Sequence, residues 1–227
     1  MNKIIITMIC LIVLSSNAFA LDETLKDIAF QRTTKITADF SGNSMIGTAT
    51  YLGNMNNSGY WLSAGHVVYE YTGDIFINSH LATIVDAGYM HYPLETVASR
   101  TTCTENGCTV IPQHERISSD SDWVVLKTPE YFPNILPTMM ATSASLDENF
   151  FYVNVMKYET INKIKYKNTT NNTMTFTMVP EYGNSGAGVF NHKGQLIGIV
   201  VERQCNPRRT IVTKITEEVL NSFLNGF

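Results

Sequence analysis

Three short segments of the sequence hold side chains that could act together in nucleophilic catalysis. Ser185 stands within the glycine-rich stretch from Gly183 to Gly188, where glycines permit positive φ angles and can turn successive backbone amides toward one point beside the hydroxyl. A serine hydroxyl is a weak nucleophile until a base removes its proton. His66 follows an apolar, strand-like run and Asp122 directly precedes another, so the sequence also supplies a candidate base and a carboxylate that could orient it.

Each of these three residues also has an ordinary structural interpretation. A single histidine such as His66 can simply be a hydrogen-bonded residue at the end of a strand, and Ser185 can serve only to form a turn. Asp122 has a rival in Asp120, but we favour Asp122 because it abuts the apolar run. The glycine-rich turn could also be the nucleophile elbow of an α/β-hydrolase. That elbow requires glycine at position 187, where Ala187 stands, and a helix after the turn, whereas a strand is expected here.

The blocks SAGHVV, DWVVLK and GNSGAGVF occur in the order His, Asp, Ser. In that order they resemble the three active-site blocks of trypsin-like serine peptidases with the chymotrypsin fold, especially secreted bacterial members such as the glutamyl endopeptidases. The resemblance covers the chain from about Met45 to Ile215. It implies that His66 is the general base, Asp122 its orienting carboxylate and Ser185 the nucleophile. It also implies that the backbone N–H groups of Gly183 and Ser185 form the oxyanion hole.

Most of the chain has the composition of short strands. Two helices are also predicted: a short one after Ala64, and Thr216–Leu224, in which Thr216 can cap the first turn. The predicted strands are rich in β-branched and aromatic residues and are separated by turn-forming residues: Thr34–Phe40, Met45–Leu52, Tyr60–Ser63, Asp74–Asn78, Ala82–Ala87, Asp122–Lys127, Phe150–Val155, Lys163–Lys167, Met174–Met178, Gly188–Phe190, Leu196–Val201 and Thr210–Lys214.

About a dozen strands and a terminal helix predict an all-β double barrel or large sandwich. The resemblance implies two antiparallel six-stranded β-barrels, with the active site in the cleft between them and a short C-terminal helix. His66 and Asp122 would come from an N-terminal barrel at residues 21–135, and Ser185 from a C-terminal barrel at residues 136–227. The stretch 127–143, which contains three prolines, is the expected connection between the two barrels.

The first twenty residues have the pattern of a signal peptide. Lys3 precedes a largely apolar stretch that is too short to span a membrane, and Ala18-Phe19-Ala20 offers the small residues that signal peptidase recognises. We therefore expect the mature chain to begin at Leu21 and the protein to be secreted or periplasmic, without a stable membrane anchor. A buried N-terminal helix is the alternative interpretation of this segment.

Composition and charge exclude several other classes of protein. The 227 residues are 44% hydrophobic and 16% charged, which is typical of a globular chain and not of a disordered one or a coiled coil. The formal charge is -4, and no run of Lys or Arg exceeds two residues, so the sequence offers no basic surface for nucleic acid. We expect a monomer that acts on a protein or peptide.

Three cysteines remain once the signal peptide, which contains Cys10, is removed. In an oxidising compartment a close pair is typical of a disulfide. Cys103 and Cys108 flank Asn106-Gly107, a strong turn signal for a short β-hairpin, so we predict that these two cysteines are bonded and that Cys205 is unpaired. A zinc site formed by this pair and a nearby histidine would fit no standard ligand spacing, and neither a metal nor an organic cofactor is expected.

The resemblance also places a primary substrate pocket ahead of the nucleophile. It implies Val179 at the floor, with Tyr182 and the strand residue Val201 along the walls. Glu202 and Arg203 could line the entrance, or they could simply pair in solvent, as such charges usually do. With valine at the floor, the pocket lacks the aspartate that attracts Lys or Arg side chains in trypsins. Val200 stands where glutamyl endopeptidases have a histidine. The sequence therefore leaves open which substrate side chain is preferred before the scissile bond.

One departure from the family concerns activation. Asn184 precedes the nucleophile where many animal members have an aspartate, and no Ile-Val-Gly-Gly-like start follows a basic residue near the mature N-terminus. A buried ammonium would find no charge to pair with at Asn184. We therefore expect hydrogen bonds from Asn184 to nearby backbone to hold the Gly183–Ser185 loop, without an inserted N-terminus.

These observations together predict a secreted serine endopeptidase that works through an acyl-enzyme intermediate. The alternative is a catalytically silent module of the same fold that binds a protein partner through the cleft. An intact set of His66, Asp122 and Ser185 with a glycine-rich loop favours the enzyme, because a module that only binds has no need of all of them.

Overall fold

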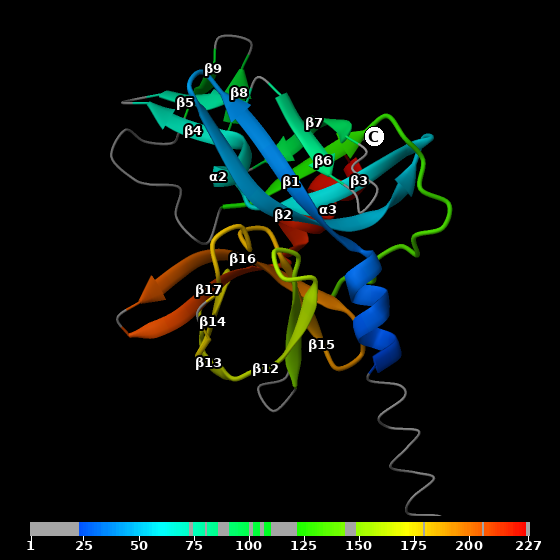
Figure 1. Cartoon of the computed structure of the whole chain (residues 1–227), viewed down its shortest axis with the longest axis vertical. Coiled ribbons are helices and arrows are strands. Elements are labelled where there is room, and N and C mark those ends of the chain that lie inside the picture. Colours follow the sequence, from blue (N-terminus) through cyan, green and yellow to red (C-terminus); the bar gives the residue numbers. More distant parts are fainter. Residues whose placement is uncertain are drawn as a thin grey trace, which may run out of the picture.

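The computed structural model describes residues 23–72, 75–79, 81–85, 91–99, 102–104, 107–109, 122–143, 149–178, 180–205 and 207–225. Its strands form two large antiparallel units, which lie one above the other in Figure 1. The chain builds the upper unit first and the lower unit second, and the segment between β10 (Val124–Thr128) and β11 (Phe150–Asn154) connects them.

The upper unit is a closed barrel of six strands in the order β1-β2-β3-β10-β7-β6. The side chains of Ile36, Ala38 and Phe40 in β1 are buried and alternate with more exposed ones, as expected for a strand that turns one face to a core. The strands of this barrel are β1 (Thr33–Phe40), β2 (Asn43–Met55), β3 (Ser58–Ser63), β6 (Leu81–Val85), β7 (His91–Ser99) and β10 (Val124–Thr128).

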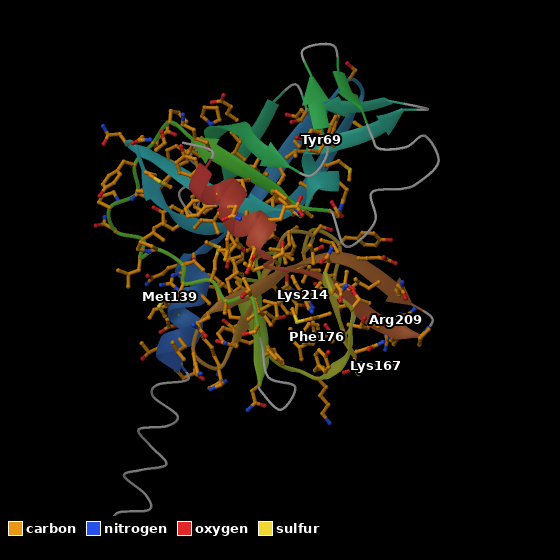
Figure 2. All side chains as sticks on the ribbon, turned by 180° about the vertical axis from the view of Figure 1, so that it is seen from behind. Tyr69, Met139, Lys167, Phe176, Arg209 and Lys214 are labelled. Carbon is orange, nitrogen blue, oxygen red and sulfur yellow. The ribbon has the colours of Figure 1, made fainter. Side chains whose placement is uncertain are left out.

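The lower unit is a seven-stranded sheet in the order β12-β11-β15-β16-β17-β14-β13. Its two outermost strands are separated in sequence only by Lys165, so the sheet curls round on itself. Its core includes Phe176, which Figure 2 labels. The strands are β11 (Phe150–Asn154), β12 (Glu159–Ile164), β13 (Tyr166–Thr169), β14 (Thr173–Phe176), β15 (Gly188–Asn191), β16 (Leu196–Cys205) and β17 (Arg208–Lys214).

The predicted all-β architecture of two antiparallel barrels is confirmed. The structure adds that the lower unit has seven strands rather than six, because the predicted strand Lys163–Lys167 is divided at Lys165. It also adds a small sheet in the order β4-β5-β9-β8, formed by β4 (Tyr69–Thr72), β5 (Ile75–Asn78), β8 (Thr102–Thr104) and β9 (Gly107–Thr109).

Strands β8 and β9 form the expected hairpin, and their register places Cys103 opposite Cys108. Residues directly opposite on antiparallel strands have Cβ atoms about 4.5–5.5 Å apart, close to the range that a disulfide spans. Mass mapping of the protein, isolated without reduction, should therefore find Cys103 bonded to Cys108 and Cys205 unpaired. Replacing the pair by serine should lower the free energy of unfolding by only about 2 kcal/mol, because the loop is short. A crosslink to Cys205 would contradict this pairing.

Both predicted helices are present. The short helix α2 (Gly65–Val68) follows Ala64, and α3 (Glu217–Asn225) begins after Thr216, whose Oγ1 accepts a 3.4 Å hydrogen bond from the amide of Val219. Helix α3 packs on the upper barrel, where the ring of Phe223 lies 6.0 Å from that of Tyr60. Among the helices of the described ranges, none has the length and apolar character needed to cross a membrane.

A third helix, at residues 23–31, was not predicted from the sequence. It is the blue helix beside the lower barrel in Figure 1. Leu25 lies against Gly194, in the turn between β15 and β16, and Ala29 is buried in the core. At its end, the carbonyl of Arg32 accepts a 2.7 Å hydrogen bond from the amide of Tyr51, and Arg32 Nε donates to the carbonyl of Leu136 at 3.0 Å. The segment thus contacts both barrels and the stretch of chain that connects them.

Deleting residues 21–32 should destabilise the protein measurably. The deletion removes the buried contacts of Leu25 and Ala29 and leaves the amide of Tyr51 without its acceptor. We expect a loss of about 2 kcal/mol or more in the free energy of unfolding, measured by urea denaturation against a chain that begins at Leu21. Equal stability of the two chains would show that the segment is dispensable.

Candidate active site

The structure brings His66 and Asp122 together through the pairing of β3 with β10. His66 lies in α2, just after β3, and Asp122 lies just before β10, with Ser63 and Val124 paired between them. Nδ1 of His66 lies 2.6 Å from Oδ2 of Asp122, and the backbone N–H of His66 donates to Oδ1 of the same carboxylate at 2.9 Å. One carboxylate therefore fixes both the ring and the backbone of the histidine.

Burial gives this pair its electrostatic character. The side chain of Asp122 is 7% exposed, whereas that of His66 is 33% exposed. Burial lowers the pKa of His66, but the hydrogen bond and the negative charge of Asp122 outweigh it, so the pKa is raised above its ordinary value. Because an ionised carboxylate only accepts hydrogen bonds, Nδ1 carries the proton in the neutral ring and Nε2 is the basic nitrogen.

Ser185 lies in a tight loop that leads into β15. The φ angles of Gly183 and Gly186 are 86° and 88°, a conformation that strongly favours glycine. The amide of Ala187 donates to the carbonyl of Asn184 at 2.9 Å, and the amide of Gly186 donates to the carbonyl of Val200 at 2.7 Å. These bonds attach the loop to itself and to β16.

The same loop docks on the upper barrel beside His66. The amide of Thr48 donates to the carbonyl of Ser185 at 2.8 Å, and Thr48 Oγ1 donates to the carbonyl of Gly183 at 2.7 Å. A Cβ atom on Gly186 would lie only 2.0 Å from the carbonyl oxygen of Thr48 and 3.0 Å from the amide nitrogen of Ala64. Gly186 therefore lets the serine loop approach the segment that carries His66.

The structure thus brings His66 and Asp122 of the upper barrel close to the loop of Ser185, which belongs to the lower barrel. Within the described residues, no hydrogen bond joins Ser185 Oγ to His66. Such bonds are often long in a resting site and tighten when substrate binds. The contact of Thr48 with the serine loop was not predicted, because one threonine within a strand gives no recognisable sequence signal.

Two backbone amides of the loop are available to an anion. In the described part of the chain, the N–H groups of Gly183 and Ser185 make no hydrogen bond, whereas those of Asn184, Gly186 and Ala187 all donate to carbonyl oxygens. Free amides in a glycine-rich turn are what an oxyanion hole requires. The sequence predicts that these two amides form the oxyanion hole, and that role stays a prediction.

The expectation for Asn184 holds for its backbone, whose N–H donates to the carbonyl of Glu181 at 3.3 Å, but not for its side chain. Its side chain is fully buried, at 0% exposure, but within the described structure neither Nδ2 nor Oδ1 has a hydrogen-bond partner. The loop is held instead by its backbone bonds and by Thr48.

Two substitutions of Asn184 should distinguish how the shape and the polarity of this side chain affect the free energy of unfolding. Asn184→Leu removes an unsatisfied buried amide, so the free energy of unfolding should stay within about 1 kcal/mol of the original or rise. Asn184→Asp buries a carboxylate without a partner and should cost several kcal/mol. Urea denaturation at neutral pH, in a Ser185→Ala background, measures both. A large loss in Asn184→Leu alone would show that the amide has a partner.

The residues predicted for the substrate pocket have varied positions. Val179 lies outside the described residues. Tyr182 is highly exposed, and the guanidinium carbon of Arg203 lies 5.0 Å from the centre of its ring, a cation–π contact. Glu202 accepts a 2.6 Å hydrogen bond from Gln204, and Val201 is buried in the core of the molecule. Tyr182 and Arg203 are thus the pair in direct contact.

Over the ranges that the structure describes, no group of three or more His, Cys, Asp or Glu side chains is arranged to hold a metal ion.

Comparison with known proteins gives one family and many similar folds. The family model described as Trypsin matches residues 52–222. A thermostable serine protease AL20 from an extremophilic microorganism is 12% identical, with a TM-score of 0.65 over 87% of this chain and 96% of that one. The active form of the Rv3671c protease from M. tuberculosis is 14% identical, with a TM-score of 0.62 over 88% and 82% of the two chains.

A Glu endopeptidase is 16% identical, with a TM-score of 0.57 over 85% of this chain and 89% of that one. No curated protein sequence matches the chain. At these identities the solved structures show a shared fold, and the match to the family model covers most of the sequence.

Proposed function

The chain belongs to the trypsin family, and we propose that it is an exported serine endopeptidase. His66 is the general base, Asp122 orients it and Ser185 is the nucleophile. The amides of Gly183 and Ser185 form the oxyanion hole. Residues 1–20 are the signal peptide, and residues 21–135 and 136–227 are the two barrel domains.

The proposed reaction proceeds through an acyl-enzyme. Nε2 of His66 takes the proton of Ser185 Oγ as this oxygen attacks the substrate carbonyl carbon, and the two amides stabilise the negative charge on the carbonyl oxygen. His66 then gives the proton to the leaving amine as the peptide bond breaks. A water molecule, deprotonated by His66, attacks the ester carbon and returns Ser185 to its free form.

One observation carries the proposal. The carboxylate of Asp122 contacts Nδ1 of His66 at 2.6 Å, which leaves Nε2 as the basic nitrogen next to the docked loop of Ser185. The raised pKa of His66 further supports the role of base, because an imidazole that binds a proton more tightly accepts one more readily.

The substrate is a protein or peptide. The side chain before the scissile bond enters a pocket formed by Val179, Tyr182, Val201, Glu202 and Arg203. The guanidinium of Arg203, which lies 5.0 Å from the ring centre of Tyr182, would stand at the entrance of this pocket. The enzyme acts as a monomer and is competent once the signal peptide is removed.

A fluorophosphonate probe tests this proposal. The probe reacts with a serine that is activated by a base, so it should attach to Ser185 of the exported protein, as mapped by mass spectrometry of the labelled peptide. A peptide library should be cleaved by the same preparation. A folded protein that neither reacts nor cleaves would instead be a silent module that binds its partner through the cleft.

A further inference from the structure

The two amides of the proposed oxyanion hole come from two halves of the serine loop that are held differently. The half that contains Ser185 is attached to both barrels, through Thr48 and Val200. The half at residues 181–183 carries the amide of Gly183. An oxyanion hole needs its donors in place before the reaction begins, so the contacts of residues 181–183 decide whether the hole is complete.

The direction of the Gly183 amide depends on the form of one β-turn. The amide of Asn184 donates to the carbonyl of Glu181 at 3.3 Å, so residues 181–184 form a turn with Tyr182 and Gly183 at its centre. The φ angle of Gly183 is 86°, as in a type II turn. In a type I turn the central peptide, which carries the N–H of Gly183, is rotated by about 180°. Because glycine adopts positive and negative φ about equally readily, Gly183 itself does not keep its N–H in the direction seen.

The residues next to Gly183 do little to hold this half of the loop. The side chain of Tyr182 is 86% exposed, and the buried side chain of Asn184 has no hydrogen-bond partner within the described structure. Thr48 binds the carbonyl of Gly183, but this carbonyl belongs to the peptide after the one that carries the Gly183 N–H. Further contacts are made by Glu181, the first residue of the turn.

Glu181 and Gly183 both contact the turn at residues 155–158, between β11 and β12. The fully buried Asn154, at the end of β11, donates from Nδ2 to the carboxylate of Glu181 at 3.3 Å. Its Oδ1 accepts a 3.1 Å hydrogen bond from the amide of Met156. A Cβ atom on Gly183 would lie 2.8 Å from the sulfur of Met156 and 3.1 Å from its Cγ. Asn154 thus connects the first residue of the loop turn with the methionine that packs on its third.

Burial decides which partner of Glu181 matters most. Lys157 pairs with the carboxylate at 2.6 Å, and the hydrogen bonds from Lys157 and Asn154 lower the pKa of Glu181, so that it is ionised at neutral pH. The side chains of Lys157 and Glu181 are both about half exposed, and an exposed ion pair contributes little. Asn154 is buried, so water does not replace a hydrogen bond that it loses.

We propose that Glu181 is a positioning residue of the catalytic site: held by Asn154, it keeps the amide of Gly183 directed at the oxyanion. This inference rests on the proposed function. Met156 acts with Glu181, because it packs on Gly183 from the same turn. When the bond between Asn154 and Glu181 is lost, residues 181–183 are free to shift and to rotate the central peptide. The oxyanion then has one donor in place of two.

Asn154→Asp breaks this contact with little change in size. The new carboxylate still offers an oxygen to the amide of Met156, but it faces Glu181 with an acceptor of like charge. We expect kcat for an ester substrate to fall at least about tenfold, since the loss of an oxyanion donor costs about 10²–10³. KM should stay within about twofold, because the amide acts on charge that develops in the transition state.

A thionoester, which has sulfur in place of the carbonyl oxygen, identifies the step that is affected. Sulfur accepts hydrogen bonds weakly, so hydrolysis of the thionoester gains little from the oxyanion hole. The ratio of kcat/KM for the ester to that for the thionoester should therefore fall in Asn154→Asp by about the factor lost in kcat. A folding defect that removes active protein would lower both rates and leave their ratio unchanged.

Glu181→Gln reverses the hydrogen bond when it is combined with Asn154→Asp. By itself it keeps an oxygen that can accept from Nδ2 of Asn154, so kcat should stay within about threefold of the original. In the double variant its N–H group can donate to the new carboxylate, and kcat should recover to within about threefold of the original. Damage to the packing around Asn154 would not be repaired by a change at Glu181.

Glu181→Ala tests the same contact from the exposed side. This half-exposed side chain can be shortened without loss of the fold, and its removal should lower kcat and the ester-to-thionoester ratio as Asn154→Asp does. Glu159→Ala is the matched control. Glu159 is an exposed carboxylate at the start of β12, directly after the same turn, and its removal should leave both quantities unchanged.

The outcomes separate the two proposals. If the original protein neither hydrolyses the ester nor reacts with the fluorophosphonate, the proposed function is wrong and this inference is overturned with it. If the original protein hydrolyses the ester but Glu181→Ala keeps its kcat or its ester-to-thionoester ratio, only the role of Glu181 is overturned. If Asn154→Asp does not fold, the comparison of Glu181→Ala with Glu181→Gln decides: equal losses in both would overturn the role of the bond from Asn154.

Discussion

Ser185→Ala should lower the rate of peptide hydrolysis by about 10⁶, and His66→Ala should lower it by about as much. A catalytic serine and its base act as a unit, so the loss of either one removes most of the contribution of the whole set. Single-turnover rates on one peptide, with each variant at the same concentration as the original protein, measure this effect. The remaining rate would come from the oxyanion hole and from substrate binding alone.

Two controls make the result specific. Ser185→Ala should keep the urea midpoint of the original protein, because the lost hydroxyl makes no hydrogen bond within the described structure. His192→Ala changes an exposed histidine in the turn after β15 and should leave the rate unchanged. If Ser185→Ala hydrolysed peptides as fast as the original protein, the nucleophile would be a different residue.

The ordered blocks around His66, Asp122 and Ser185 could be predicted because each combines an unusual side chain with a strong local pattern. His66 and Asp122 adjoin apolar runs that became β3 and β10, and the pairing of these strands brings the two residues together. The docking of the serine loop could not be predicted. It depends on Thr48 and on the close approach of Gly186 to β2, and neither residue differs in sequence from many others.

The elements that were missed have physical explanations. Strand β7 contains Pro93, which usually argues against a strand. Here Pro93 lies in the part of β7 that pairs with β6 but not with β10. Its missing N–H therefore affects the hydrogen bonding of β7 with at most one neighbouring strand. The helix at residues 23–31 does show apolar spacing in Leu25, Ile28 and Ala29. A helix this short is only marginally stable by itself and depends on its contacts with both barrels. The apolar spacing was therefore too brief to predict a helix.

The hydrogen bonds of the Asn184 side chain were predicted from the chemistry of an amide rather than from the geometry of the loop. Buried amides usually find hydrogen-bond partners, so the expectation of backbone contacts was reasonable for a residue next to the nucleophile. Within the described structure the buried side-chain amide of Asn184 instead has no hydrogen-bond partner. A sequence indicates the type of a residue but does not fix the direction of its side chain.

Asp122→Asn should lower the rate of hydrolysis by about 10⁴ while it leaves the arrangement of the site intact. The amide of asparagine can donate a hydrogen bond to Nδ1, which would place the proton of the neutral imidazole on Nε2. In that tautomer His66 cannot take the proton of Ser185. The size of the carboxamide is close to that of the carboxylate, so the expected loss reflects protonation rather than packing.

The same substitution should shift the pH dependence in a defined direction. Below its pKa, His66 carries a proton and cannot act as a base, so the rate rises as the pH increases through that pKa. In the original protein the midpoint should lie above about 6.5, because Asp122 raises the pKa of His66 against the opposing effect of burial. In Asp122→Asn the two contributions of the carboxylate disappear and burial remains, so the midpoint should fall below about 6.5.

The pH dependence of kcat/KM on an ester substrate measures this shift, and NMR titration of the His66 ring gives the pKa without any need for turnover. Asp39→Asn is the matched control, because Asp39 is exposed on β1 and accepts its hydrogen bond from Ser44. Its midpoint should equal that of the original protein. An unchanged midpoint in Asp122→Asn would show that another group sets the protonation of His66, and Asp122 would then lose its assigned role whatever the change in rate.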